Sequence, residues 1–366
     1  MRADVVVVGG GPAGLAVAIG AAQRGLEVLV LEKRGWPIDK GCGEGLMPAG
    51  VRALERLGAR SLLDAADCSS FIGVRYVQED GSDAEACFPR TDGEGLGIRR
   101  LALSSALARR ANEAGATLRA DAQVRSVTRT EGRMRVSLGD EIIDAGIIVA
   151  ADGLHSSLRR AAGLDVELAG PRRFGLRQHF RCAQGSPFVE VHFAEGVEAY
   201  VTPVGTDRIG VAFLWEDGVS STPVSFSALL ALFPVLQERL RDASPDSDPR
   251  GAGPLLVGSR RCTTDGMALI GDAAGYVDAI TGEGLSLAFH CAEALSAILP
   301  EALARGGDRR SLRAYERAFS RAFARYAYLT RGLLLLSRRP ALRRAVVHML
   351  ARFPRMFERI LGALAS

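Results

Sequence analysis

Apolar runs and glycine-rich turns alternate over the first residues of the chain. A β-branched run at 4–8 (DVVVV) predicts a buried parallel strand, and the small and apolar residues at 15–24 predict a helix. Gly25 follows as a helix C-cap, and a second apolar run at 27–31 (EVLVL) predicts another strand. This is the pattern of a βαβ unit, whose strands we expect to be parallel and joined by a right-handed connection.

Further apolar runs continue the α/β pattern. Residues 142–150 (IIDAGIIVA) and 267–270 predict two more buried strands. Helical patterns cover 51–57 and 100–114, and residues 117–138 contain two strands. We therefore expect one largely parallel sheet flanked by helices.

Elsewhere the pattern is different. Residues 71–90 and 172–215 alternate polar and apolar positions, which predicts a strand pair and an antiparallel sheet. Residues 35–50 and 241–254 are rich in Gly and Pro, so we expect an extended loop in each. From residue 285 onward the pattern is helical.

These shifts in pattern predict a discontinuous organisation. The chain has 366 residues, enough for two or three domains. We expect an α/β domain made of residues 1–70, 97–170 and 256–300. A β-sheet domain made of residues 71–96 and 171–255 is inserted into it. Residues 301–366 form a C-terminal helical region.

The composition excludes several classes of protein. With 48% hydrophobic and 24% charged residues, the chain is an ordinary globular sequence and not a disordered or fibrous one. We see no apolar run long enough to cross a bilayer. The six cysteines form no CxxC pair, which gives no signal for a zinc site or a disulfide framework. We expect a reduced, cytoplasmic setting.

The net charge of +4 is unevenly distributed. Residues 301–366 hold fifteen Arg against four acidic residues, which leaves the rest of the chain net acidic. A basic, amphipathic C-terminus favours either a helical cap with Arg outward or peripheral contact of 309–366 with the inner face of a membrane. Arg is also simply abundant, because only two Lys occur. We expect no nucleic-acid partner.

The first chemical motif is Gly9-x-Gly11-x-x-Gly14, between the first strand and its helix. The three glycines allow a tight turn, a close approach of the backbone to a pyrophosphate, and close packing of helix on strand. Glu32 ends the second strand, where a carboxylate meets the ribose hydroxyls of an adenine dinucleotide. The motif does not distinguish NAD from FAD. The predicted cofactor-binding set also includes the neighbours Pro12, Ala13, Lys33 and Arg34.

Two later segments are more specific. Residues 151–159 (ADGLHSSLR) resemble the ADGxxSxxR segment of the p-hydroxybenzoate hydroxylase-like flavoproteins, and residues 269–275 (LIGDAAG) resemble their GDAA segment. The resemblance covers roughly residues 1–300. It implies the superfamily of group A monooxygenases, geranylgeranyl reductases and flavin halogenases. The implied fold is a GxGxxG-type, Rossmann-like FAD-binding α/β domain with an inserted antiparallel sheet and a helical C-terminus.

The resemblance also implies roles for single residues. Asp272 would accept hydrogen bonds from the ribityl hydroxyls, or it is a plain helix cap. Gly282 and Gly284 open a helix whose N–H groups would stabilise negative charge on the flavin, or they only form a turn. The remaining implied cofactor contacts are Arg100 at a helix start, Val124 near adenine, and Asp152, which is otherwise structural.

The loop 39–48 would lie beside the flavin ring. Lys40, Cys42 and Glu44 are our candidate catalytic residues at the substrate face, although Cys42 would equally be a small buried side chain and Lys40 a loop charge. Tyr200 is a further candidate, on the cavity wall. We assign no essential base to either sheet histidine, His179 or His192.

The favoured function is a flavin-dependent monooxygenase. NAD(P)H would reduce FAD, either in the same cleft or through a separate electron-donor protein, and an oxygen atom would pass to a hydrophobic aromatic or polyketide-like small molecule. No metal is implied. The alternative enzyme is a geranylgeranyl-reductase-like protein that saturates prenyl double bonds, favoured by the Cys-Gly loop and the Thr-Gly-Glu-Gly pattern. The non-enzymatic alternative is a flavin-binding, membrane-associated scaffold. The WxWxIP motif of halogenases is missing from the sequence, which argues against halogenation.

Overall fold

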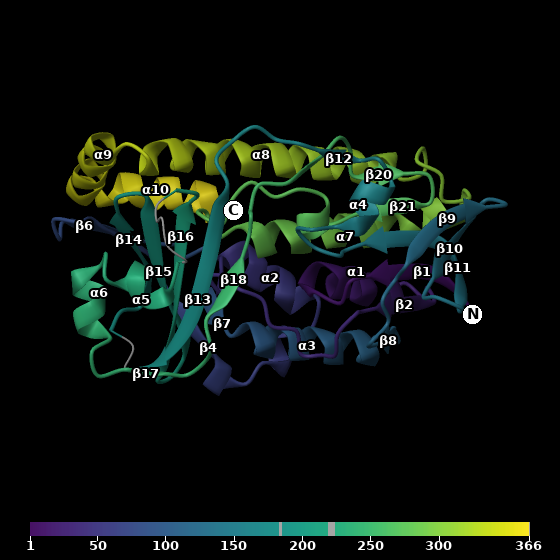
Figure 1. Ribbon diagram of the computed structural model, residues 1–366, viewed down its shortest axis with the longest axis horizontal. Coiled ribbons are helices and arrows are strands. Elements are labelled where there is room, and N and C mark those ends of the chain that lie inside the picture. Colours follow the sequence, from purple (N-terminus) through teal and green to yellow (C-terminus); the bar gives the residue numbers. More distant parts are fainter. Residues whose placement is uncertain (183–184, 219–223, 366) are drawn as a thin grey trace.

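The computed structural model describes residues 1–182, 185–218 and 224–365. Its first layer is a sheet with the strand order β20-β21-β11-β1-β2-β8, in which the four pairs from β21 to β8 are parallel (Figure 1). An antiparallel hairpin, β9–β10, extends from β11. The strands are β1 (Arg2–Val8), β2 (Val28–Leu31), β8 (Thr117–Arg119), β9 (Ser126–Thr130), β10 (Arg133–Ser137), β11 (Ile142–Ala150), β20 (Thr263–Thr264) and β21 (Met267–Leu269).

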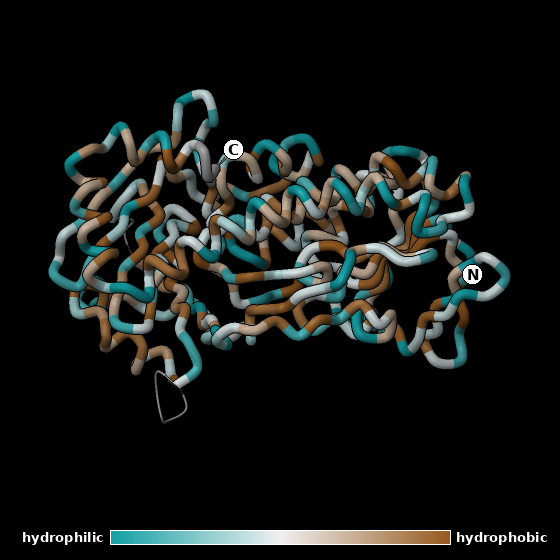
Figure 2. Tube along the Cα trace, turned by 90° about the horizontal axis from the view of Figure 1, so that it is seen from above, coloured by the Kyte–Doolittle hydropathy of each residue, from teal (hydrophilic) through white to brown (hydrophobic). Residues whose placement is uncertain are grey.

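The β-branched run at the N-terminus is the centre of this layer. Val5, Val6 and Val7 have no exposed surface, because β1 is paired on both edges and covered on both faces. Helices α1 (Pro12–Ala22), α3 (Arg100–Glu113) and α7 (Gly284–Ala304) pack in the same core. Hydrophilic positions gather in the peripheral loops (Figure 2). The predicted βαβ unit is confirmed.

The second layer is a sheet with the order β17-β13-β16-β15-β14-β5-β6, with β18 also on β13. The antiparallel sheet expected at 172–215 is confirmed by the pairs β13–β16, β16–β15 and β15–β14, but the whole sheet is mixed, since β14 pairs with β5 in parallel. The reason is that the β5–β6 hairpin comes from a distant part of the chain. The strands are β5 (Gly73–Val77), β6 (Asp83–Cys87), β13 (Arg173–Arg181), β14 (Phe188–Ala194), β15 (Val197–Gly205), β16 (Arg208–Glu216), β17 (Ser244–Pro245) and β18 (Arg250–Ala252).

Three predictions of secondary structure were wrong. The helix expected at 51–57 is α2 (Pro48–Arg56), which begins earlier because Pro48 is well suited to a first helical turn. Residues 117–138 hold three strands, β8, β9 and β10, rather than two. The loop at 241–254 contributes β17 and β18, which pair with β13.

Short elements connect the two layers. A small sheet of order β3-β7-β4 carries the loop 39–46, and β12 pairs with β19. The remaining short elements are β3 (Gly45–Leu46), β4 (Cys68–Phe71), β7 (Gly95–Ile98), β12 (Asp165–Val166), β19 (Gly258–Ser259), α4 (Ser157–Ala161), α5 (Phe226–Leu230), α6 (Pro234–Arg239) and three 3₁₀ turns at Arg60–Leu62, Ala65–Asp67 and Gly271–Ala273.

The C-terminal region is helical, as predicted. Helix α7 is followed by α8 (Arg313–Ser337), α9 (Pro340–Arg352) and α10 (Pro354–Ala365), which lie along one edge of the molecule (Figure 1). Helices α9 and α10 pack against β6, so these helices do cap the second sheet. Helix α7 is apolar and long enough to cross a membrane, contrary to our expectation that no such run exists. It packs against α1, α2 and α8 and carries nine buried residues, as a core helix does.

Candidate active site

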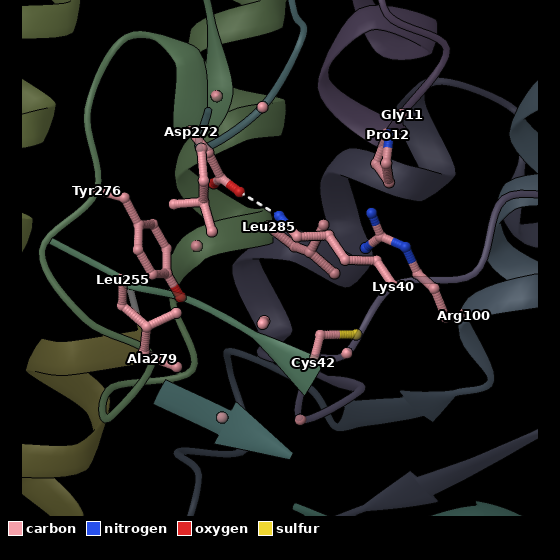
Figure 3. A pocket seen from close by; sticks show the side chains of 18 of the residues that line it. Gly11, Pro12, Lys40, Cys42, Arg100, Leu255, Asp272, Tyr276, Ala279 and Leu285 are labelled. Atoms are coloured by element: carbon pink, nitrogen blue, oxygen red, sulfur yellow. Dashed lines mark hydrogen bonds and ion pairs between the residues drawn. The ribbon is translucent and has the colours of Figure 1, made fainter. Parts of the chain in front are cut away.

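A cavity of about 970 Å³ lies between the two layers, at the carboxyl ends of β1 and β2. Ligands bind at this edge in open α/β sheets. The cavity is lined by residues far apart in the sequence, from Val8 to Leu361, and includes the loop 38–45. Every residue of our predicted site lines this cavity except Gly14. Figure 3 shows Gly11, Lys40, Cys42, Arg100 and Asp272 around it.

The glycine motif forms one end of the cavity. A Cβ atom on Gly14 would lie 2.1 Å from the carbonyl oxygen of Gly9, so only glycine lets α1 start this close to β1. A Cβ on Gly11 would meet no atom within 4 Å. The first turn of α1 therefore borders open space: Pro12 has no N–H, so the unpaired N–H groups of this turn begin at Ala13, which lines the cavity, as a pyrophosphate site requires.

Glu32 is fixed beside this turn. Its carboxylate accepts hydrogen bonds from the backbone N–H groups of Gly10 (2.7 Å) and Arg34 (3.1 Å). Lys33, Arg34 and Val124 line the same end of the cavity. Val124 belongs to the segment between β8 and β9 and not to a strand, so its backbone is not committed to a sheet.

Arg100 provides a test of whether the cavity fits the expected cofactor. Its residue is 8% exposed, and among the described residues its Nε has no hydrogen-bond partner. The guanidinium points into the cavity between Pro12 and Lys40 (Figure 3). A buried Nε–H without a partner is costly unless a ligand accepts its hydrogen bond. FAD, with its pyrophosphate and flavin oxygens, is such a ligand, so these residues fit the group.

Lys40 and Asp272 form an ion pair of 2.5 Å across the cavity (Figure 3). Lys40 comes from the loop after β2 and Asp272 from the turn after β21. The two predicted residues therefore lie together, and Asp272 presents an acceptor to the cavity, as the ribityl role requires.

A motif residue to which we assigned no role joins the two specific segments. Arg159 is 3% exposed and donates hydrogen bonds to the carbonyl oxygens of Ala273 (3.0 Å) and Leu154 (3.0 Å). It thereby fixes the turn that carries Asp272. The Asp152 carboxylate instead lies 2.5 Å from Ser156 Oγ and accepts from the N–H of Leu158, which favours its structural alternative at the start of α4.

The Thr-Gly-Glu-Gly segment lies at the start of α7. Gly282 has φ 68°, a conformation that favours glycine, and Gly284 is the first residue of α7. Burial raises the pKa of the Glu283 carboxyl to about 7, which the positive charge of Arg325 opposes. The N-terminus of α7 thus meets the cavity, and Glu283 brings a carboxyl group that is partly protonated near neutral pH.

The loop 39–46 carries two of our candidate catalytic residues, Cys42 and Glu44, and places them in different surroundings. Cys42 faces the cavity (Figure 3), and burial raises the pKa of its thiol although Arg100 opposes this effect. Glu44 is 4% exposed, and both carboxylate oxygens already have partners: Oε2 lies 2.6 Å from His179 Nε2, and Oε1 accepts from the N–H of Arg100 at 2.7 Å. This geometry favours a positioning role for Glu44 over direct proton transfer.

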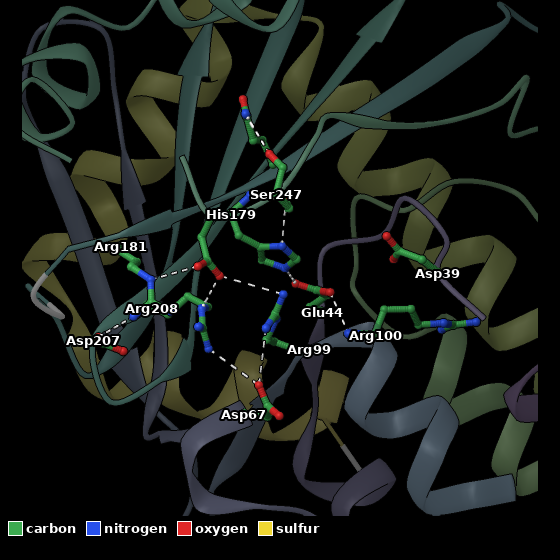
Figure 4. Close-up of polar contacts among 12 residues, drawn as sticks. Asp39, Glu44, Asp67, Arg99, Arg100, His179, Arg181, Asp207, Arg208 and Ser247 are labelled. Carbon is green, nitrogen blue, oxygen red and sulfur yellow. Dashed lines mark hydrogen bonds and ion pairs between the residues drawn. The ribbon is translucent and has the colours of Figure 1, made fainter. Parts of the chain in front are cut away.

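Sequence reasoning missed the partners of this loop. Arg177 is 1% exposed and pairs with Asp39 at 2.5 Å. His179, two residues along the same strand, contacts Glu44, as Figure 4 shows. The only sequence signal for these contacts is the spacing along β13. Arg173, Arg177 and His179 are separated by even numbers of residues, so their side chains lie on the same, buried face of the strand. An adjoining network joins Arg99 and Arg208 to Asp67 and Asp246.

Tyr200 lines the cavity as predicted, but its hydroxyl donates to the carbonyl oxygen of Ile280 at 3.1 Å. Burial raises the pKa of Tyr200 well above its ordinary value, so it stays neutral. Beneath it, Arg173 pairs with Glu198 (2.7 Å) and Asp278 (2.9 Å). These contacts fix the segment between the Asp272 turn and α7 on the second sheet.

Away from the glycine motif the cavity becomes apolar. Its wall there comes from the small sheet, the second sheet, the 255–280 segment and the C-terminal helices. The apolar lining residues of this part include Phe71, Val74, Val189, Val191, Leu255, Ala279, Ile280, Leu329, Leu333 and Leu361.

The fold, together with the cavity lined by the glycine motif, Arg100 and Asp272, defines a FAD-dependent oxidoreductase. A family model described as "FAD binding domain" matches residues 2–327, and the chain belongs to this family. Digeranylgeranylglycerophospholipid reductase 1 of Methanopyrus kandleri is 31% identical over 322 residues, 83% of this chain and 82% of the relative. Menaquinone reductase of Mycolicibacterium smegmatis is 30% identical over 309 residues, 78% and 73% of the two chains.

Solved structures share the fold at lower identity. A flavoprotein/dehydrogenase from Cytophaga hutchinsonii superposes with a TM-score of 0.86 at 19% identity, covering 99% of this chain and 92% of that one. A flavin-dependent brominase gives 0.85 at 18% identity, covering 100% and 94%. At this identity the likeness establishes the α/β flavoprotein fold that the sequence predicted, and no activity.

Proposed function

We propose that this protein is a FAD-dependent reductase that saturates carbon–carbon double bonds in the isoprenoid chain of a lipid. The observation that carries the proposal is the apolar arm of the cavity, which leads away from Cys42 and Asp272 to Leu333 and Leu361. A long hydrocarbon chain is the kind of ligand that such a wall binds. The reductase relatives, whose substrates carry isoprenoid chains, support the same class.

Bound FAD, once reduced by an electron donor, would supply the two electrons that reduce a double bond and would return to its oxidised form. The N-terminus of α1 and Arg100 would bind its phosphate and ring oxygens, Glu32 its ribose, and Asp272 its ribityl chain. The α7 N-terminus would stabilise negative charge at the ring, because its first residue, Gly284, lines the cavity.

The reduction also consumes protons. The Cys42 thiol stays protonated at neutral pH because burial raises its pKa, and it faces the cavity. Cys42 would donate its proton to one carbon of the double bond and regain one from solvent, so the enzyme is unchanged after turnover. Glu44 would hold the loop that carries Cys42, through His179 and the start of α3.

The monooxygenase that the resemblance first favoured stays a prediction, as do its aromatic or polyketide-like substrate and NAD(P)H or a separate protein as electron donor. The reductase relatives favour reduction over oxygenation.

Single turnover without oxygen tests the proposal. Dithionite-reduced holoenzyme is mixed with a digeranylgeranyl lipid or menaquinone, and products are analysed by mass spectrometry. We expect products that gain two hydrogens per double bond, with turnover at least tenfold slower in Cys42→Ala and unchanged in Cys87→Ala, whose thiol lies outside the cavity lining. Incorporation of ¹⁸O from ¹⁸O₂ in air, with no saturated product anaerobically, would overturn it.

A further inference from the structure

The C-terminal helices α8, α9 and α10 each have two faces. Their inner faces join the core: Tyr326 and Leu334 pack beneath α8, Leu350 beneath α9 and Phe357 beneath α10. Arg343 fixes α9 from inside, because it pairs with Glu79 at 2.7 Å and lies 4.7 Å above the ring of Phe193. The position of these helices is therefore explained by packing, but their outer faces are not.

The outer faces carry exposed apolar side chains. Eleven large hydrophobic side chains are exposed in the described part of the chain; five of them lie on these three helices, and a sixth, Phe353, lies between α9 and α10. Within α8 and α9 they recur at helical spacing: Tyr328 and Leu335 are seven residues apart, as are Leu342 and Met349, so each pair lies on one face. We call the six residues the cap face: Tyr328 (80% exposed), Leu335, Leu342, Met349, Phe353 (53%) and Ile360.

The segment that carries the cap face is rich in arginine. Residues 326–366 contain eight Arg and one acidic residue, Glu358. Arg338 and Arg343 have carboxylate partners, Glu216 and Glu79. Within residues 1–182, 185–218 and 224–365, the exposed arginines without an ion pair include five on these helices, Arg331, Arg344, Arg352, Arg355 and Arg359, and also Arg339, which lies between α8 and α9.

The same helices form the apolar end of the cavity. Leu329 and Leu333 of α8 and Leu361 of α10 line it. One layer of helix therefore separates the cavity from the cap face. A ligand whose hydrocarbon chain is held in a bilayer would have its shortest route to the cavity through this layer.

We propose that the cap face docks on an anionic phospholipid bilayer, from which the isoprenoid chain enters the cavity between α8 and α10. Apolar side chains would enter the acyl boundary while unpaired Arg contact the lipid phosphates, the arrangement by which amphipathic helices bind interfaces. The docking itself follows from exposed apolar groups and charge complementarity. The entry of an isoprenoid chain also rests on the proposed function.

The test is co-sedimentation of the FAD-loaded, full-length protein with phosphatidylcholine vesicles, with and without phosphatidylglycerol. We expect binding only to the anionic vesicles and weaker binding as salt rises. Arg352→Glu/Arg355→Glu/Arg359→Glu should weaken binding roughly 100-fold or more, since each interfacial Arg contributes about 1 kcal/mol. The matched control, Arg125→Glu/Arg260→Glu/Arg261→Glu, changes the same charge on other exposed residues and should bind distinctly better than the cap-face variant.

A second variant addresses the apolar part. Leu342→Ser/Met349→Ser/Phe353→Ser should also reduce vesicle binding at least tenfold, whereas Leu232→Ser/Val235→Ser, at exposed positions near α6, should not. Equal binding to neutral vesicles, no binding at all, or a dimer in sedimentation velocity that the triple serine variant dissociates would overturn the docking. Vesicle binding without saturation of any lipid would contradict the proposed function and leave the docking intact.

Discussion

Glu44 Oε2 lies 2.6 Å from His179 Nε2, and the two residues are 135 positions apart in the sequence. The other oxygen of the same carboxylate accepts from the N–H of Arg100, at the start of α3. Glu44 has φ 60°, an unfavourable conformation for a residue other than glycine. This one side chain thus joins the loop that carries Cys42 to both layers of the protein.

Removing the histidine should destabilise the protein. His179→Phe leaves the buried carboxylate of Glu44 without its closest partner, so we expect the free energy of unfolding in urea to fall by about 2–4 kcal/mol. His290→Phe, at an exposed position of α7, should change it by less than about 0.5 kcal/mol. Equal stability of the two variants would mean that the Glu44–His179 contact is unimportant.

The glycine motif gives a prediction about cofactor content. Gly11→Val should fold, because a Cβ at this position meets no protein atom within 4 Å, but its side chain would occupy the expected pyrophosphate site. We expect the wild-type protein to be yellow with one FAD per chain, and the variant to be colourless with a similar circular dichroism spectrum. Gly332→Val, equally uncrowded on α8, should keep its FAD. Stoichiometric FAD in Gly11→Val would refute the assigned site.

Asp272 can be tested by the affinity for FAD. A hydrogen bond to a charged acceptor contributes about 1.5–3 kcal/mol, so Asp272→Ala should raise the Kd for FAD roughly 10- to 100-fold in a fluorescence-quenching titration. The control is Asp140→Ala, which removes an exposed carboxylate far from the cavity lining. If both variants bind FAD as the wild type does, Asp272 is only a structural residue.

The pKa of Glu283 gives a prediction for pH. Its pKa in the folded protein is about 7, above its usual value, so the folded state holds this proton more tightly than the unfolded state. Stability from this group is therefore present below about pH 4.5 and lost as pH rises toward 7. Between pH 5 and pH 8, the free energy of unfolding of the wild-type apoprotein should fall by up to about 3 kcal/mol more than that of Glu283→Gln. Glu94→Gln, at an exposed position, should follow the wild-type profile; the same profile for Glu283→Gln would contradict the shift.

The sequence allowed confident prediction where structure is local. The βαβ unit at 1–31 could be read from neighbouring residues, because strand, glycine turn and helix are encoded within about thirty positions. The segments around Asp152 and Asp272 were found by resemblance, and both line the cavity.

Contacts between distant segments could not be predicted in this way. The pairing of Arg177 with Asp39 joins β13 to a loop 138 residues away, and no periodic pattern reports such a contact. Likewise, the alternating pattern of β5 and β14 gave their faces but not their relative direction. Glu44 was named from its loop alone, and only its buried partners revealed what it does there.

The hydrogen bonds of Arg159 to the carbonyl oxygens of the Asp272 turn have a consequence for how the protein is made. A ribosome releases the glycine motif long before residue 272, and α7, which packs on α1, is completed only at Ala304. The FAD site therefore cannot form until the last third of the chain has been synthesised. Its folding depends on contacts between residues far apart in the sequence. Because FAD binds only the completed fold, intracellular FAD would increase the proportion of chains that stay folded.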